Sequence, residues 1–507
     1  MKLSSRSATT LKSTTTETEL FVQSPEKWTP HKGQRLGMKF LLEHAAGGLF
    51  ADPGVGKTST VFGAFKFLKK RGMAEKMLVI APLRPCYLVW PKEQQKWLDF
   101  HDIKVVVLHG PKKDELLEEK ADIYVINPEG LDWLIGATKT KSLRGKVSVT
   151  ADMKWFKGLG FDTLVIDELS KFKNPQSSRH KAIKAIHGTF ARRWGLTGTP
   201  AANGLMDLFG ECYMLDMGRT FGPYITHFRN KYFVPGYDGF SWNLRRGAEQ
   251  EIYERLAPLV LRLSAEDYVE MPQEVPNPIK FDLPAAAQKI YNELEDDMFT
   301  VLEGRGVAAA NGGVASMKCR QVTNGGIYVE DAPSLIKKKG PREWVDIHDA
   351  KTDLLEDLIG EIHGAPLLVG YEFRHDLERL WRRFGKDIPY IGSGVSPKVA
   401  DRIEQQWNRG EIPLLFGQPQ SMGHGLNFQG AGNHVAWYGL TYDFDTYDQF
   451  NRRVRRQGNK NKRVFIHHFI ARNTVDEVMY FVLRSKDHTQ RHLLDALNVL
   501  KRRRRQK

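Results

Sequence analysis

The feature that most constrains the fold of this chain is the stretch Gly48-Leu49-Phe50-Ala51-Asp52-Pro53-Gly54-Val55-Gly56-Lys57-Thr58. A short apolar run, as in a buried strand, enters a turn with two glycines and a proline, and a helix-like segment from Thr60 to Lys69 follows. These are the parts of a phosphate-binding loop, whose backbone N–H groups surround an anion at a helix start. The first glycine of the strict pattern is replaced by Ala51, so an ordinary glycine-rich loop is the alternative.

Each residue of this loop has an expected role toward ATP. Lys57 reaches the β- and γ-phosphates, and the Thr58 hydroxyl is a ligand for Mg²⁺. Upstream, Gln34 is placed to read an adenine edge, because an amide both donates and accepts, although a surface glutamine is the simpler reading. The candidate nucleotide-binding residues around the loop are Gln34, Gly54, Val55, Gly56, Lys57, Thr58 and Ser59.

A pair of acids supplies the second half of this candidate site. The run Phe161–Ile166 is typical of a buried parallel strand, and it ends in Asp167-Glu168-Leu169-Ser170. Acids at the carboxyl end of such a strand lie where open α/β sheets bind ligands. We expect Asp167 to hold Mg²⁺ and Glu168 to polarise the attacking water, with an exposed acidic pair as the alternative.

Length and composition indicate a multidomain globular chain. The 507 residues correspond to about three domains. No apolar run reaches the ~18 residues of a membrane span, and the first residues lack an apolar signal core, so a cytoplasmic location, without a membrane partner, is expected. Cys86, Cys212 and Cys319 lie far apart, which supports neither a zinc site nor a disulfide framework.

The charge balance points to a polyanionic partner. The formal net charge is +15, and six positive charges lie in the final segment Lys501–Lys507, which contains Arg502. Nucleic acid is the expected partner of such a chain, and the alternative is an anionic membrane surface or a charge excess that serves only solubility.

The alternation of strand-like and helix-like runs predicts an α/β fold with two parallel sheets. We expect a disordered arm at residues 1–24, a first lobe at 25–272 with a helical insertion at about 205–260, and a linker at 273–276. A second lobe is predicted at 277–485, with an irregular insertion at about 304–345, and a basic tail at 486–507.

The second lobe contributes a cluster of arginines in Gln449-Phe450-Asn451-Arg452-Arg453-Val454-Arg455-Arg456-Gln457-Gly458. At helical spacing Arg456 shares a face with Arg452 and with Arg453. A nucleotide held by one lobe needs a positive group that arrives from the other lobe on closure. The alternative is a basic face that binds DNA, for which Arg452 and Arg455 are candidates.

Taken together, these stretches resemble a superfamily 2 helicase motor of the Swi/Snf type, most like the compact forms that phages encode. The resemblance covers about residues 28–485. Besides the segments above it rests on Ala81-Pro82-Leu83, Trp90-Pro91-Lys92-Glu93, Leu196-Thr197-Gly198-Thr199-Pro200 and Gly423-His424-Gly425-Leu426-Asn427.

The resemblance implies two RecA-like lobes with ATP and Mg²⁺ between them and DNA across their top. It assigns arginine-finger roles to Arg453 and Arg456, nucleotide contacts to Gly425 and Asn427, and coupling to the segment around Thr197. The further candidate contacts to nucleic acid are Arg84, Thr197, Arg452, Arg455 and Arg502. Ser170 replaces the family's usual histidine, which leaves the coupling role of that position open.

The sequence therefore predicts an ATP-dependent DNA translocase or helicase, of the phage-encoded type, acting in the cytoplasm of the host cell. An RNA helicase of the same superfamily is the main alternative, and a non-catalytic nucleic-acid-binding adaptor is another. A phosphate-loop kinase is disfavoured, because the second lobe ends in an arginine segment and offers no acceptor pocket.

Overall fold

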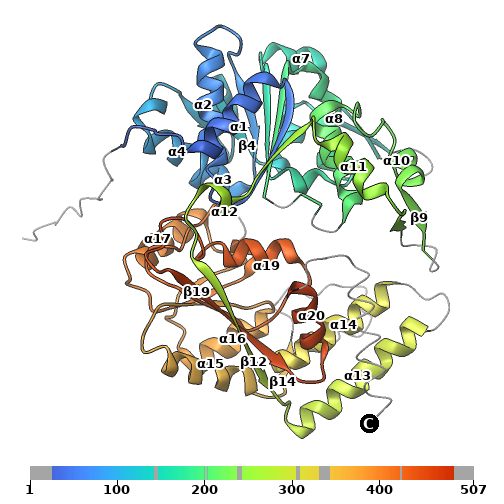
Figure 1. The fold of residues 1–507 in the computed structure, drawn as a ribbon, viewed down its shortest axis with the longest axis vertical. Coiled ribbons are helices and arrows are strands. Elements are labelled where there is room, and N and C mark those ends of the chain that lie inside the picture. The colour runs from blue at the N-terminus through green and yellow to red at the C-terminus, as the bar shows by residue number, and fades with distance from the viewer. Residues whose placement is uncertain are drawn as a thin grey trace, which may run out of the picture.

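The chain forms two α/β lobes, one above the other in Figure 1. The computed structural model describes residues 25–141, 147–198, 200–201, 204–236, 242–303, 309–329, 343–422 and 425–484. The predicted arm at 1–24 and tail at 486–507, with Arg502, lie outside these residues, as do Thr199, Gly423 and His424. No helix in the described ranges is long and apolar enough to cross a membrane.

The first lobe is built on a parallel sheet of seven strands in the order β11-β1-β8-β7-β2-β4-β3. Its strands are β1 Ala46–Ala51, β2 Met77–Ile80, β3 Val105–Val107, β4 Ile123–Ile126, β7 Thr163–Asp167, β8 Arg192–Thr197 and β11 Val260–Leu263. Its helices are α1 Lys32–Glu43, α2 Lys57–Lys69, α3 Leu83–Leu88, α4 Trp90–Lys96, α5 Lys113–Glu118, α6 Leu131–Leu134, α7 Met153–Gly158, α8 Ser178–Ile186, α9 Leu208–Asp216, α10 Ile225–Tyr232, α11 Ala248–Leu256 and α12 Ala265–Tyr268.

Both faces of this sheet are covered, which explains the continuous apolar runs in the sequence. Along β2, Met77 and Val79 face one core cluster, whereas Leu78 and Ile80 face another. All four side chains are fully buried. A strand buried on both sides needs apolar residues at every position, so the predicted parallel sheet follows from the sequence.

The second lobe has a parallel sheet of six strands in the order β12-β19-β18-β15-β17-β16. Its strands are β12 Gln273–Phe281, β15 Leu367–Gly370, β16 Tyr390–Ile391, β17 Leu414–Gly417, β18 His434–Trp437 and β19 Arg463–Ala471. Its helices are α13 Ala285–Glu303, α14 Ala309–Asn324, α15 Ala350–Glu361, α16 Arg374–Phe384, α17 Pro397–Asn408, α18 Pro419–Met422, α19 Phe444–Asn451 and α20 Val475–Arg484. The predicted fold class, two parallel-sheet lobes, is confirmed.

The boundary between the lobes differs from the predicted one. Residues 273–276, predicted as the linker, are the start of β12, which pairs with β19 from Gln273 to Phe281. This segment contains Pro276 and Pro278, but β12 is an edge strand, where a residue without an N–H is tolerated. The connection is instead the segment 264–272, which contains α12 and runs between the lobes in Figure 1.

The two insertions also contain regular structure that their composition did not indicate. The first, predicted as helical, includes the hairpin of β9 Phe233–Pro235 and β10 Trp242–Leu244 as well as α9, α10 and α11. The second, predicted as irregular, contains α14 and the hairpin of β13 Gly326–Tyr328 and β14 Trp344–Asp346. A further hairpin, β5 Thr138–Lys141 with β6 Val147–Thr150, is exposed on the first lobe.

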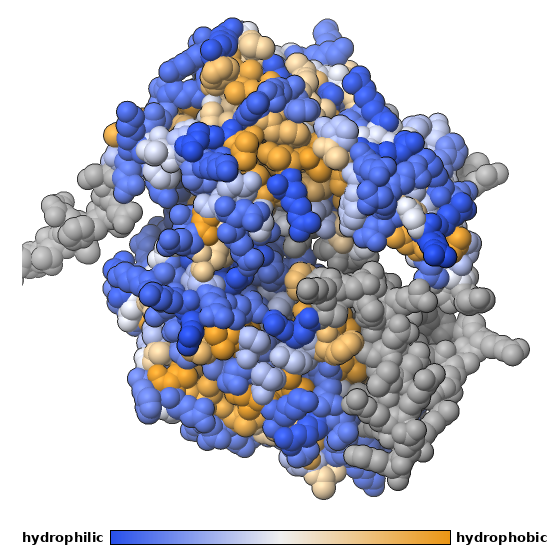
Figure 2. Space-filling view, in the orientation of Figure 1, coloured by the Kyte–Doolittle hydropathy of each residue, from blue (hydrophilic) through white to orange (hydrophobic). Residues whose placement is uncertain are grey.

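The surface seen in Figure 2 is mostly hydrophilic, with apolar residues gathered in separate areas of the two lobes.

Inside the second lobe lies a buried ion pair. The Lys351 ammonium is 2.8 Å from the Asp476 carboxylate, and both side chains are at most 2% exposed. Lys351 also donates to Asn324, and Asp476 accepts from the Thr323 hydroxyl. The pair therefore joins α14, α15 and α20.

Removing one member of this pair should destabilise the second lobe. We expect Lys351→Met to lower its free energy of unfolding by about 3–5 kcal/mol, because the Asp476 carboxylate then stays buried without its cation. The double variant Lys351→Met/Asp476→Leu should lose much less. Guanidinium unfolding followed by tryptophan fluorescence measures both, with Lys39→Met, at an exposed pair with Glu43, as the control. A double variant less stable than the single one would contradict this account.

Candidate functional site

A cavity of about 740 Å³ lies between the two lobes, at the carboxyl ends of the first-lobe strands. Most of the candidate nucleotide-site residues predicted from the sequence line it. They are Gln34, Gly54, Gly56, Lys57, Thr58, Ser59, Asp167, Glu168, Gly425, Asn427, Arg453 and Arg456. Val55 is buried beneath the loop, with 1% exposure. The fold thus brings together segments that are up to about 400 residues apart in the chain.

The glycine-rich loop has the conformation that its sequence requires. Gly54 and Gly56 have φ values of +98° and +76°, which residues with a side chain rarely adopt. A Cβ atom at Gly56 would also collide with the Gln34 amide. Gly56 directly precedes α2, so the loop presents the first backbone N–H groups of a 13-residue helix to the cavity.

Lys57 folds back over this loop. Its ammonium donates to the carbonyl oxygens of Ala51, at 2.6 Å, and Asp52, at 3.4 Å. Burial lowers the pKa of Lys57, while the nearby carboxylates of Glu168 and Asp167 act in the opposite direction. A lysine held in this way is close to the loop and poorly hydrated, so its charge is available to a phosphate at little cost in solvent reorganisation.

Two residues that precede the loop in the chain, His31 and Gln34, pack against it and hold its conformation. His31 caps α1, and its ring lies 3.0 Å from the carbonyl of Val55. Gln34 is buried, and its amide donates to the Ser59 hydroxyl at 3.0 Å while its oxygen accepts from the backbone of His31. The amide predicted to read an adenine edge is therefore engaged in shaping the phosphate loop.

The acid pair stands at the end of β7. Asp167 accepts a hydrogen bond of 3.0 Å from the indole of Trp90, and burial raises its pKa to about 6. Glu168 has a φ of +65°, which turns the chain out of the strand, and it accepts from the Ser170 hydroxyl at 2.8 Å. Ser170 stands at the motif position of the histidine that is usual in the Swi/Snf type, and it holds the Glu168 carboxylate through this hydrogen bond.

The donor set fits a bound divalent cation. Thr58 and Asp167 both line the cavity, and a hydroxyl with a carboxylate is a suitable pair of oxygen ligands for Mg²⁺. The raised pKa of Asp167 reflects a buried carboxylate whose desolvation a cation would offset. The described residues contain no cluster of three or more histidine, cysteine, aspartate or glutamate side chains for a metal.

The second lobe places two arginines in the cavity, Arg453, which is buried, and Arg456, which is half-buried. Arg453 donates to the carbonyl of Leu426 at 2.9 Å, and burial lowers its pKa to about 10. Arg456 donates to the side-chain oxygen of Asn427, and burial also lowers its pKa. A Cβ atom on Gly54 would lie 3.6 Å from the Arg456 side chain, so this arginine reaches across the cavity to the phosphate loop.

The helical spacing assumed for the arginines is wrong. The helix α19 ends at Asn451, and Arg452 is its C-cap, so residues 452–456 form turns. The four arginines therefore do not share helix faces. They point to different partners, which a periodicity argument could not separate.

The residues predicted to contact nucleic acid are engaged elsewhere. Thr197 is fully buried in β8, and Arg84 donates to the carbonyl of Ser421 in the other lobe. Arg452 pairs with Asp448 and Asp52, and Arg455 pairs with Glu266. Thr197 is thus an interior residue, and the three arginines bind partners within the protein. Positive charge in a sequence does not show which partner each side chain reaches, so the sequence could not separate these contacts from contacts to nucleic acid.

Some residues of the site were not predicted. Glu404 of α17 lines the cavity, accepts from the backbone of Asn427 at 3.0 Å, and has its pKa raised by burial to about 7. Its helix has an ordinary amphipathic pattern, so no signal in the sequence marks it. Asp52 and Trp90 stand inside motifs quoted from the sequence, Asp52 in the phosphate loop and Trp90 in the segment Trp90-Pro91-Lys92-Glu93, but neither was assigned a role.

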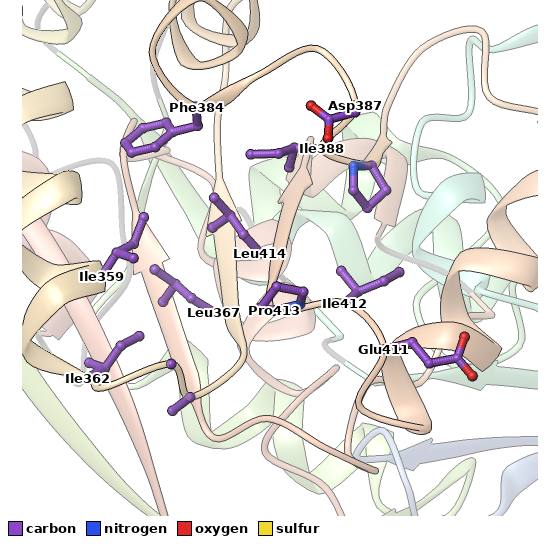
Figure 3. A pocket seen from close by; sticks show the side chains of 13 residues that line it. Ile359, Ile362, Leu367, Phe384, Asp387, Ile388, Glu411, Ile412, Pro413 and Leu414 are labelled. Carbon is purple, nitrogen blue, oxygen red and sulfur yellow. The ribbon is translucent and has the colours of Figure 1, made fainter.

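A second cavity, of about 420 Å³, lies within the second lobe and carries none of the motifs. Figure 3 shows it at the starts of β15 and β17, among apolar side chains, with Asp387 and Glu411 at its edge. The chemistry predicted from the sequence therefore belongs to the cavity between the lobes.

Comparison with known proteins agrees with this arrangement. The model of the SNF2-related domain matches residues 29–326. Protein p41 of Acyrthosiphon pisum secondary endosymbiont phage 1 is 32% identical over 93% of this chain and 99% of its own length. YwqA of Bacillus subtilis, named for an ATP-dependent helicase/translocase, is 23% identical over 93% of this chain. Human ZRANB3, a "DNA annealing helicase and endonuclease", is 23% identical over 89% of it.

The chain spans only part of the last two relatives, 49% of YwqA and 39% of ZRANB3, but nearly all of the phage protein. The family model covers more than half of the chain and includes the phosphate loop, the acid pair and the Leu196–Pro200 segment. The chain therefore belongs to the family of the SNF2-related domain.

Proposed function

We propose that this protein is an ATP-dependent DNA translocase or helicase that hydrolyses ATP in the cavity between its lobes. The observation that carries the proposal is the reach of Arg456 from the second lobe to Gly54 of the phosphate loop in the first. A site whose cationic groups come from two separate lobes is complete only when the lobes are together. Hydrolysis and lobe movement are then linked.

The residues that line the cavity have different roles in ATP hydrolysis. The loop N–H groups and Lys57 bind the β- and γ-phosphates, and Glu168 accepts a proton from the attacking water. Arg456 and Arg453 stabilise the charge that spreads over the transferring phosphoryl group. A Mg²⁺ ion held by Thr58 and Asp167 would supply further neutralisation of the phosphate charge.

A second contact between the lobes lines the same cavity and supports a link between hydrolysis and lobe movement. The backbone of Gly425 in the second lobe packs on α3 of the first, since a Cβ atom there would lie 3.4 Å from the Pro85 nitrogen.

The net charge of +15 and the name of the relative ZRANB3 favour DNA as the polymer along which the protein moves. Binding through phosphates would be independent of sequence and sensitive to salt. The phage origin of the relative p41 supports action inside a host cell.

The direct test is an ATPase assay with a panel of nucleic acids. We expect duplex or single-stranded DNA to stimulate ATP hydrolysis and RNA to stimulate it much less. Lys57→Ala should abolish the activity, because the charge developing on the phosphates loses its partner. Stronger stimulation by RNA would favour an RNA helicase, and no ATPase under any condition would favour a non-catalytic adaptor.

The role of Arg456 predicts a change in turnover rather than in binding. Arg456→Ala should lower kcat by about 10³-fold or more while the ATP concentration at half-saturation changes little, as for arginine fingers in general. The assay is run at saturating DNA. A normal plateau rate with a raised DNA requirement would instead place Arg456 on the nucleic-acid surface.

The role of Glu168 predicts a trapped complex. Glu168→Gln removes the proton acceptor but keeps the shape of the side chain and leaves Asp167 in place. We expect ATP to bind and hydrolysis to fall by about 10²-fold or more, so that ATP-bound protein accumulates on DNA. Filter binding with labelled ATP measures this. Normal turnover in this variant would remove Glu168 from the catalytic groups.

A further inference from the structure

Two arginines of the second lobe, Arg452 and Arg455, contact the first lobe or the segment that connects the lobes. The Arg452 guanidinium lies 2.6 Å from the carboxylate of Asp448 on the preceding helix α19 and 3.3 Å from the carboxylate of Asp52. Its side chain is 14% exposed, so this ion pair is largely shielded from water. Arg452 directly precedes Arg453, and the same short turn continues to Arg456.

Asp52 is well placed to transmit this contact. Its carboxylate also accepts a hydrogen bond of 3.1 Å from the backbone N–H of Ala265, at the start of α12. Its carbonyl accepts from the backbone of Val55 and from the ammonium of Lys57. One residue of the phosphate loop is thus bonded to the loop lysine, to the segment that connects the lobes, and to the second lobe.

Arg455 contacts the same connecting segment. It donates to the carbonyl of Pro272 at 2.9 Å and to the carboxylate of Glu266 at 2.9 Å. Its side chain is also 14% exposed, whereas Glu266 is 65% exposed. Arg452 and Arg455 therefore hold the connecting segment 264–272 from two sides, one through Asp52 and one directly.

We propose that Arg452 and Arg455 form an interlobe clamp that sets the closed arrangement of the lobes and thereby positions Arg453 and Arg456 in the cavity. They are positioning residues, not contacts to nucleic acid. The clamp and the two cavity arginines share one five-residue turn, so displacing the turn moves all four guanidinium groups together. A displacement of about 1 Å at a reacting centre costs on the order of 10²-fold in rate.

The kinetic part of the test rests on the proposed function. Arg452→Gln and Arg455→Gln should each lower kcat by about ten-fold at saturating ATP and DNA, and the DNA concentration at half-stimulation should stay within about two-fold. Arg472→Gln is the matched control, because Arg472 is half-exposed and pairs with Asp282 within the second lobe. The control should behave like the wild type.

Charge reversal separates a lost contact from a lost charge. Arg455→Glu should be as impaired as Arg455→Gln or more so, and Glu266→Arg/Arg455→Glu should regain part of the rate. Recovery in the double variant is expected only if residues 266 and 455 meet in the working enzyme. Equal impairment of the single and double variants would overturn the direct contact at Glu266.

A structural measurement tests the clamp without any ATPase activity. All three cysteines are buried, so the substitutions Lys39→Cys on α1 and Lys289→Cys on α13 give one accessible thiol on each lobe for a pair of fluorophores. In the full-length protein, Arg452→Gln/Arg455→Gln should lower the energy transfer between them relative to the wild type and to Arg472→Gln.

The outcomes are distinguishable from those of the proposed function. Lower energy transfer supports the clamp even if no nucleic acid stimulates hydrolysis. The clamp is overturned if energy transfer and kcat are unchanged while the variants need more DNA for half-stimulation, since both arginines would then bind the phosphate backbone.

Discussion

The organisation of this molecule depends on the approach of an arginine from one lobe to the phosphate loop of the other. Arg456 lies so close that a Cβ on Gly54 would be in van der Waals contact with it, and the φ of +98° at Gly54 is one that residues with a side chain rarely adopt. The first lobe alone holds the loop and the acid pair, and the second holds the arginines and Glu404. Neither half is a complete site.

The cavity concentrates opposite charges under burial. Desolvation raises the pKa of Asp167 to about 6 and of Glu404 to about 7, and it lowers the pKa of Lys57, Arg453 and Arg456. Each charge alone would be costly there, and their mutual proximity offsets part of that cost. Incoming phosphates add negative charge beside the cations, so they compete with the protein's own carboxylates for the same partners.

Much of the fold was readable from the sequence, because its signals are local. The apolar runs of β2, β7 and β15 are continuous since both sheet faces are covered, and the glycine spacing before Lys57 reflects backbone angles that only glycine adopts readily. The edge strand β12 was missed because its prolines are tolerated only where no neighbour needs their N–H.

The site was partly readable for the same reason. Side chains that act through their own motif, such as Lys57 and Glu168, were assigned roles from their neighbours in the chain. Arg452 and Arg455 were assigned to nucleic acid, because a cluster of arginines in a sequence does not show which way each side chain faces. Their partners Asp52 and Glu266 lie about 190 residues or more away in the chain, so only the fold reveals the pairs.

The connection between the lobes has a consequence for the strength of their association. Val269 is buried in a first-lobe cluster with Ala51 and Val55, Met271 packs against the same cluster, and β12 begins at Gln273, so only Pro272 separates the two packed bodies. So short a tether keeps the lobes at an effective concentration on the order of millimolar or above. Contacts far too weak to join two separate proteins are then sufficient to bring the lobes together and, when broken, to let them part.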